Sequence, residues 1–385
     1  MNIVLALSYV TIIGVWVAAQ VVPIPYVVNL LLLVMSILYV ACHWSLILLE
    51  EQAIVKAAVE SGNETDISSE TLGKEEAMQL PIVGSLSLFS IYLAFKFFDK
   101  ELVNLLISFY FGMVGCAALT VTFAPVLAAI FPKGLKDKTL KKEIQLKHPF
   151  PSFIAGNSPW EIKIDASLPE ICSFLASSVF SAIYFKKKHW AMNNVIGICF
   201  CLQGIERFSL GTYKTGAILL IGLFFYDIFW VFGTEVMVTV AKNLDGPIKL
   251  LFPRSLIPNP ETNKIETSLL GLGDIVVPGF FLSLLLRFDA FNANLPCLSQ
   301  KDPKMDIHAS FSKPYFYTGM MGYFIGMGLT MFVMIKFEAA QPALLYLVPG
   351  CVGSSLLCAI VKGETDKLFA YSEEQEDLET KGKDD

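Results

Sequence analysis

The chain has 385 residues and a formal net charge of −6, and 54% of its residues are hydrophobic while 17% are charged. A soluble domain rarely has so large an apolar fraction, so the composition indicates a polytopic membrane protein. The acidic excess lies mostly in residues 50–77 and in the tail from Glu373 onward, which gives no indication of nucleic acid as a partner.

Long apolar runs follow one another along the chain, and a helix that spans a bilayer needs roughly 20 apolar residues. Because every backbone polar group must be satisfied inside lipid, runs of this length are predicted to be helices. The predicted fold class is an all-α polytopic membrane protein, a bundle of about nine transmembrane helices preceded by one further run. The runs lie near residues 3–22, 24–49, 80–98, 103–131, 167–185, 191–206, 215–241, 268–287, 315–335 and 342–361.

The first run has two interpretations. Val17, Ala18 and Ala19 before Gln20 fit the small-residue pattern of a signal-peptidase site, so residues 1–22 could be a cleaved signal peptide. The absence of a basic side chain at the start and the length of the run favour an extra helix. The rest of the chain is divided into N-terminal helices (23–209), C-terminal catalytic helices (210–361) and a tail (362–385).

The positions of the basic residues predict the orientation in the membrane. The loop 132–166 opens with the lysine-rich segment FPKGLKDKTLKKEIQLKH, which the positive-inside rule assigns to the cytosol. Alternation from this loop places the 50–78 loop and the C-terminus in the cytosol as well. The glycosylation sequon at Asn63 would then face the cytosol, and the basic stretch 186–190 conflicts locally by falling on the lumenal side.

The last residues, KGKDD, place Lys381 and Lys383 in a K-x-K-x-x pattern. This pattern resembles a dilysine signal that returns membrane proteins to the endoplasmic reticulum, an address read by a receptor. The alternative is a charged, solvated tail. The expected location is therefore the endoplasmic reticulum membrane, with the C-terminus cytosolic.

Two aspartates interrupt neighbouring apolar runs. Asp227 lies near the middle of LLIGLFFYDIFWVFG, and Asp274 follows a Gly-x-Gly near the start of SLLGLGDIVVPGFF. A carboxylate in hydrocarbon is costly, so each aspartate marks a candidate functional site. If the two helices are antiparallel neighbours, the carboxylates can meet at a similar depth.

Three explanations of this pair compete. The acids could join helices structurally, although no basic residue lies near them within either run; they could line a proton or cation pathway; or they could catalyse hydrolysis. Two close carboxylates share a proton, so one can activate water while the other polarises a carbonyl. This chemistry needs no metal or other cofactor, and the eight cysteines are interpreted as buried apolar residues rather than disulfides or zinc ligands.

The residues around the acids favour catalysis. Gly271 and Gly273 weaken a helix and remove side-chain bulk beside Asp274, which suits close approach of another backbone. An extended substrate could bind there by edge pairing, whereas the alternative role of such glycines is tight helix packing. The third segment, QPALLYLVPG, begins with Gln341 and a proline, Pro342, that suits the start of a helix.

Three motifs together resemble those of the intramembrane aspartyl proteases, which include the presenilins and the signal peptide peptidases. They are Tyr226-Asp227, Gly271-Leu272-Gly273-Asp274 and Pro342-Ala343-Leu344. The segments YDIFWVFGTEVMVTVAK, KHWAMNNVIG and FFDKELVNLLISFYF are similar to the signal peptide peptidase branch, and the resemblance covers about residues 80–370. A presenilin would be expected to have a proline where Leu345 stands. The departure from the family lies in residues 1–50, where the extra run precedes the expected first helix.

The resemblance implies a presenilin-like fold and a protease of the endoplasmic reticulum that cuts remnant signal peptides and type II membrane segments. It implies Asp227 and Asp274 as the catalytic dyad, with a substrate cleft formed by Tyr226, Gly271, Leu272, Gly273, Gln341, Pro342, Ala343 and Leu344. It also implies homo-oligomers and partners in endoplasmic-reticulum-associated degradation, besides the lipid bilayer itself. A non-catalytic scaffold and a proton- or cation-coupled transporter remain as alternatives. The Gly322-x-x-x-Gly326 motif is interpreted as internal packing rather than an oligomer seam.

Overall fold

The structure is a computed structural model that describes residues 3–21, 25–60, 70–71, 74–132, 139–146, 160–234, 236–244, 246–253, 267–293, 311–337 and 341–373. Its helices are α1 (Ile3–Val21), α2 (Tyr26–Glu60), α3 (Lys74–Phe97), α4 (Lys100–Ile130), α7 (Leu168–Lys187), α8 (Trp190–Arg207), α9 (Tyr213–Phe232), α10 (Val236–Asn243), α11 (Gly273–Asn292), α12 (Pro314–Phe337), α13 (Leu344–Lys362) and α14 (Thr365–Ala370).

Short strands connect some of these helices in three separate pairs. Strand β1 (Glu70–Thr71) pairs in parallel with β4 (Phe208–Ser209). The other two pairs are antiparallel: β2 (Thr139–Leu146) with β3 (Trp160–Ser167), and β5 (Lys249–Pro253) with β6 (Thr267–Gly271). In the last pair Lys249 lies opposite Gly271, which places the hairpin directly before α11.

Seven helices within the described residues are long and apolar enough to cross a membrane: α2 over Tyr26–Ile47, α3 over Met78–Phe97, and α4, α7, α9, α12 and α13. This confirms the predicted all-α polytopic membrane protein, whereas the number nine stays a prediction. Helix α1 contributes a shorter apolar stretch, Leu7–Gln20. Large apolar side chains such as Leu106, Phe225 and Phe332 are exposed on the sides of the bundle, as expected for a surface that faces lipid.

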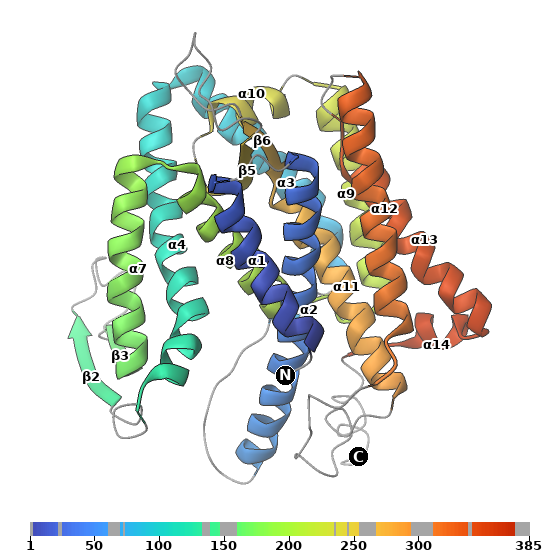
Figure 1. The fold of residues 1–385 in the computed structure, drawn as a ribbon, viewed down its shortest axis with the longest axis horizontal. Helices are drawn as coiled ribbons and strands as arrows, with labels where there is room; N and C mark the ends of the chain where they lie inside the picture. Colours follow the sequence, from blue (N-terminus) through green and yellow to red (C-terminus); the bar gives the residue numbers. More distant parts are fainter. Residues whose placement is uncertain are drawn as a thin grey trace, which may run out of the picture.

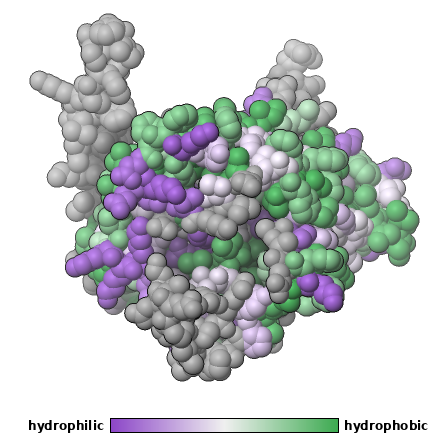
Figure 2. All heavy atoms as spheres, turned by 90° about the horizontal axis from the view of Figure 1, so that it is seen from above, coloured by the Kyte–Doolittle hydropathy of each residue, from purple (hydrophilic) through white to green (hydrophobic). Residues whose placement is uncertain are grey.

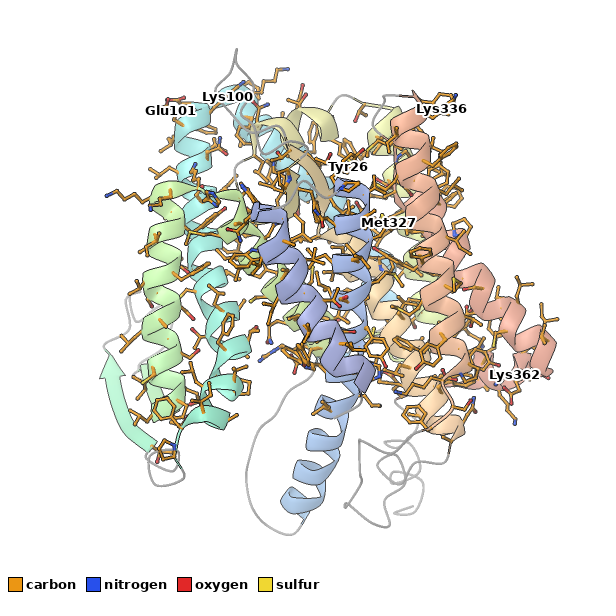
Figure 3. The ribbon with its side chains drawn as sticks, in the orientation of Figure 1. Tyr26, Lys100, Glu101, Met327, Lys336 and Lys362 are labelled. Carbon is orange, nitrogen blue, oxygen red and sulfur yellow. The ribbon has the colours of Figure 1, made fainter. Side chains whose placement is uncertain are left out.

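The helices run up and down through a single bundle (Figure 1). The β2–β3 pair and α14 lie towards one end, and α10 with the β5–β6 hairpin lies towards the other. Lys100 and Lys336 mark this second end and Lys362 the first (Figure 3). Figure 2 looks down on the second end, with hydrophobic residues around the sides and hydrophilic residues gathered mainly over α4 and α7.

The core is formed mainly by α2, α8, α9, α11, α12 and α13, whose buried side chains include Leu38, Ile205, Phe281 and Leu347. Helices α12 and α13 approach closely through glycine. A Cβ on Gly322 would lie 2.1 Å from the carbonyl oxygen of Gly350, and one on Gly326 would lie 2.8 Å from the carbonyl oxygen of Tyr346. The interpretation of the Gly322-x-x-x-Gly326 motif as internal packing is therefore confirmed.

Two predicted helices have different limits in the structure. The run 268–287 begins as strand β6, and its helix starts only at Gly273, because the first residues pair with β5. Asp274 therefore lies in the first turn of its helix. The run 215–241 is divided after Gly233, whose backbone N–H bonds to the carbonyl of Phe229 at the end of α9, and α10 follows as a separate helix.

Helix α1 packs against the bundle: the Trp16 indole N–H donates to the carbonyl of Ala191 at 3.0 Å, and the Trp44 indole N–H donates to the hydroxyl of Tyr9. The removal of residues 1–22 and the four-part division of the chain stay predictions. Within the expected tail, the segment from Thr365 to Glu373 packs on the helices. Asn63, Lys381 and Lys383 lie outside the described residues.

Candidate active site

Asp227 is buried towards the end of α9, with 4% of its surface exposed. The helix begins where the Thr212 hydroxyl accepts the backbone N–H of Thr215 at 3.0 Å, an N-cap that favours helix formation over the apolar residues that follow. One oxygen of Asp227, Oδ2, accepts a hydrogen bond from the backbone N–H of Leu344 at 3.0 Å. The carboxylate is thus held from outside its own helix.

Asp274 lies where β6 ends and α11 begins. A Cβ added to Gly271 would lie 3.4 Å from its carboxylate oxygen Oδ2, whereas a Cβ on Gly273 would meet nothing within 4 Å. The backbone carbonyl of Asp274 accepts a hydrogen bond from the buried hydroxyl of Tyr323 at 3.1 Å. The absence of a side chain at Gly271 therefore leaves space directly beside this carboxylate.

The two aspartates come together because α9 and α11 are antiparallel neighbours (Figure 1). Within the described part of the chain, neither carboxylate forms an ion pair with a basic side chain. A structural role as partner of a buried base is thus not supported.

The third motif, Pro342-Ala343-Leu344, contacts Asp227 of the first motif. Pro342, Ala343 and Leu344 are buried, and the carbonyl of Pro342 accepts the N–H of Leu345 at 3.3 Å to start the turn that leads into α13. The first N–H groups of a helix have no partner within it. The N–H of Leu344, which has no partner within its own helix, donates to Asp227 instead. Half-buried Gln341 precedes this turn.

Two other predicted residues occupy the flanks of the site. Tyr226 lies against α3, where a Cβ on Gly84 would be 3.7 Å from its ring, and Trp230 packs beside it with ring centroids 6.4 Å apart. Leu272 donates its backbone N–H to the carbonyl of Ile248 at 3.0 Å, which extends the hairpin pairing up to the start of α11.

The hairpin was not predicted from the sequence, in which β5 lies between the apolar runs 215–241 and 268–287. One edge of β5 is held by α8: the Asn194 side chain donates to the carbonyl of Leu251 at 2.7 Å and accepts its N–H at 2.8 Å. Asn193 donates to the carbonyl of Lys249 at 2.7 Å. The outer edge of β6 has no strand partner among the described residues, and Leu269 on this strand is 48% exposed.

Tyr323 and Asn194 were also not recognised from the sequence. Two adjacent asparagines inside an apolar run were the available signal, because buried amides need hydrogen-bond partners. Tyr323 lies between the glycines of α12 and gave no such signal. No group of three or more His, Cys, Asp or Glu side chains suited to a metal ion occurs in the described segments.

Paired carboxylates on antiparallel helices of a polytopic membrane protein are the arrangement of an intramembrane aspartic protease. Comparisons with known proteins agree. The profile of the signal peptide peptidase family matches residues 64–375. Signal peptide peptidase of Homo sapiens is 41% identical over 305 residues, which cover 79% of this chain and 74% of the relative.

The mouse (Mus musculus) signal peptide peptidase is likewise 41% identical, over 81% of this chain and 76% of the relative. Intramembrane protease 2 of Caenorhabditis elegans is 45% identical over 55% of this chain and 44% of the relative. No solved structure matches the chain. The chain belongs to the signal peptide peptidase family, and it is an intramembrane-cleaving protease of the aspartic type.

Proposed function

We propose that Asp227 and Asp274 are the catalytic dyad, and that the protease cuts remnant signal peptides and type II membrane segments in the endoplasmic reticulum. The proposal depends mainly on one observation: Asp227 is buried and fixed by the Leu344 N–H, on a helix that packs directly against the helix of Asp274. The names of the human and mouse relatives support signal peptides as the substrate class.

The chemistry follows from the shared proton. Two carboxylates at close range hold one proton between them, so one is ionised and the other protonated. The ionised group removes a proton from water, the water oxygen attacks the peptide carbonyl, and the protonated group donates to the carbonyl oxygen. Transfer of a proton to the amide nitrogen then breaks the C–N bond. The Leu344 N–H occupies Oδ2 of Asp227 and orients the other oxygen of that carboxylate.

Substrate binding is proposed at the outer edge of β6. A helical segment must be opened before its carbonyl can reach the carboxylates, and an extended segment can pair with an unpartnered strand. Strand β6 ends at Gly271, where an added Cβ would lie 3.4 Å from the Asp274 carboxylate. Tyr226, Leu272, Gln341 and the Pro342–Leu344 turn would shape the cleft on the other sides.

The decisive experiment compares cleavage of a signal-peptide-derived segment by the purified wild type, Asp227→Asn and Asp274→Asn. Each substitution keeps the shape of the side chain and removes its acid–base function, so the rate should fall by about 10²–10⁴-fold. Cleavage by both variants at the wild-type rate would refute the dyad. No cleavage by the wild type, together with no binding of a transition-state-like inhibitor, would favour the scaffold or transporter.

A matched pair of glycine variants tests the edge-pairing model. Gly271→Val places a side chain beside the Asp274 carboxylate in a strand that accepts valine, and cleavage should fall at least about tenfold. Gly273→Ala adds a methyl group where nothing lies within 4 Å, so it should retain most activity. Equal losses in both variants would contradict a crowding effect at the carboxylate.

Localisation and partners are proposed from the sequence and the family resemblance. The K-x-K-x-x ending suggests retrieval to the endoplasmic reticulum, and replacing Lys381 and Lys383 by serine should release the protein to later compartments. Homo-oligomers and partners in endoplasmic-reticulum-associated degradation are proposed from the family resemblance. Because Gly322 and Gly326 pack against α13, a contact between copies would use other surfaces.

A further inference from the structure

A buried cation lies at the opposite end of α11 from the proposed dyad. Arg287 is 1% exposed, and its guanidinium reaches α2 through Ser45 Oγ at 3.2 Å and its own helix through Ser283 Oγ at 3.3 Å. It also donates to Ser209 Oγ at 3.4 Å, immediately before α9. A buried charge of this kind is costly unless it is paired.

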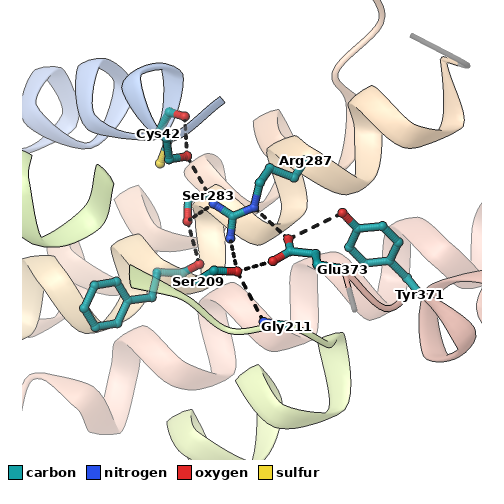
Figure 4. Close-up of polar contacts among 9 residues, drawn as sticks. Cys42, Ser209, Gly211, Ser283, Arg287, Tyr371 and Glu373 are labelled. Carbon is teal, nitrogen blue, oxygen red and sulfur yellow. Dashed lines mark hydrogen bonds and ion pairs between the residues drawn. The ribbon is translucent and has the colours of Figure 1, made fainter. Parts of the chain in front are cut away.

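The partner of Arg287 comes from the C-terminal segment. Glu373 accepts the Arg287 Nε–H at 2.6 Å through Oε1 and a hydrogen bond from Ser209 through Oε2 (Figure 4). The Glu373 backbone N–H donates to the carbonyl of Gly211 at 2.7 Å. One residue thus joins the end of α11 to the residues that lead into α9.

The rest of the segment is also fixed in place. Leu368 is fully buried, Tyr371 packs against Phe288 with ring centroids 5.2 Å apart, and Ser372 pairs with Thr212 at the start of α9. These contacts position Glu373 next to Arg287. They make Thr365–Glu373 a strap across the ends of α9 and α11.

The strap can influence the dyad through helix geometry. Arg287 follows Asp274 by thirteen residues, so the two lie about 20 Å apart along α11. Over this length, a tilt of about 3° displaces the carboxylate by about 1 Å, and a misplacement of that size can reduce a catalytic rate about 10²-fold. The same reasoning applies to α9, which carries Asp227.

We infer that Glu373 and Arg287 are positioning residues that hold α9 and α11 in the relative orientation required by the catalytic dyad. This inference rests on the proposed function of Asp227 and Asp274. The contacts of both residues are with α2, α11 and the residues that lead into α9, about 20 Å along α11 from Asp274. Their effect should therefore appear in kcat per folded molecule and in the affinity for a transition-state-like inhibitor, while KM changes little.

The test uses the full-length protein in lipid vesicles, with kcat, KM, inhibitor Kd and melting temperature measured for each variant. Glu373→Gln removes the counter-charge and should lower kcat by about 10–100-fold. The double variant Arg287→Met with Glu373→Gln removes both charges, so its melting temperature should recover relative to the single variant. Its kcat should stay at least about tenfold below the wild-type value, because the ion pair between Arg287 and Glu373 is absent.

The control is Asp366→Asn, which removes an exposed carboxylate from α14 and should leave all four values unchanged. Wild-type kcat per folded molecule in the double variant would overturn the inference, because the pair would then serve stability alone. If the charge variants fail to fold, Ser209→Ala provides the test, because it removes hydrogen bonds to both residues of the pair. A fall in kcat supports the positioning role of Arg287 and Glu373, and an unchanged kcat overturns it. Asp274→Asn in the same series shows separately whether the dyad assignment itself fails.

Discussion

Substitution of Gly322 by alanine should separate α12 from α13 and disable the active site. The added Cβ would lie 2.1 Å from the Gly350 carbonyl oxygen and 2.5 Å from the Ser354 hydroxyl. A carbonyl in a helix cannot rotate away as a side chain can. The two helices must therefore move apart by about 1 Å to restore an ordinary contact, and overpacking of this kind costs about 1–3 kcal/mol.

The displacement should reach both aspartates. Tyr323, next to Gly322, donates to the carbonyl of Asp274, and Leu344 at the start of α13 donates to Asp227. A shift of about 1 Å in either contact can reduce the rate about 10²-fold. We therefore expect Gly322→Ala to lose most cleavage activity as well as stability.

Thermal unfolding and cleavage of a signal-peptide-derived segment, measured in one detergent, check this prediction. Gly328→Ala is the matched control, because a Cβ at that position of α12 meets nothing within 4 Å. It should be neutral or should stabilise the helix by up to about 1 kcal/mol. A wild-type melting temperature and rate for Gly322→Ala would refute the reasoning, as would equal losses in Gly328→Ala.

Three further predictions concern contacts around the site and at the opposite end. Tyr323→Phe removes one hydrogen bond to the Asp274 carbonyl, so stability should fall by about 0.5–1.5 kcal/mol and cleavage should slow several-fold in the same assays. Asn194→Leu leaves the N–H and carbonyl of Leu251 without partners, which should cost about 2–4 kcal/mol in thermal unfolding and impair cleavage. Burial lowers the pKa of Lys313 below 10.5, so the unfolded chain binds more protons as the pH approaches that value, and stability should rise with pH there. Lys313→Met should abolish this rise, and melting temperatures measured between neutral and alkaline pH would show it.

The motifs could be found in the sequence because their chemistry is incompatible with their surroundings. A carboxylate within an apolar run is conspicuous, and Asp227 and Asp274 were each identified in this way. The glycines before Asp274 indicated space around the acid, and a Cβ at Gly271 would lie 3.4 Å from its carboxylate oxygen Oδ2. Pro342 indicated the start of a helix, which begins two residues later.

The β5–β6 hairpin could not be predicted because its stability depends on a distant helix. Lys249–Pro253 is too short and irregular to be recognised as a strand, and it is stabilised by Asn193 and Asn194 of α8. The strand β6 was taken for helix because its residues are apolar, and a short apolar run has no period that separates the two.

The sequence by itself determined that this protein crosses the membrane several times and carries two acids that lipid would not tolerate without a function. Those properties follow from composition and from the cost of a buried charge, which are local. Only the tertiary structure decided that the N–H of Leu344 binds Asp227, that Tyr323 contacts Asp274, and that Glu373 neutralises Arg287. Each of these contacts joins residues far apart in the chain, and its formation depends on how the helices pack.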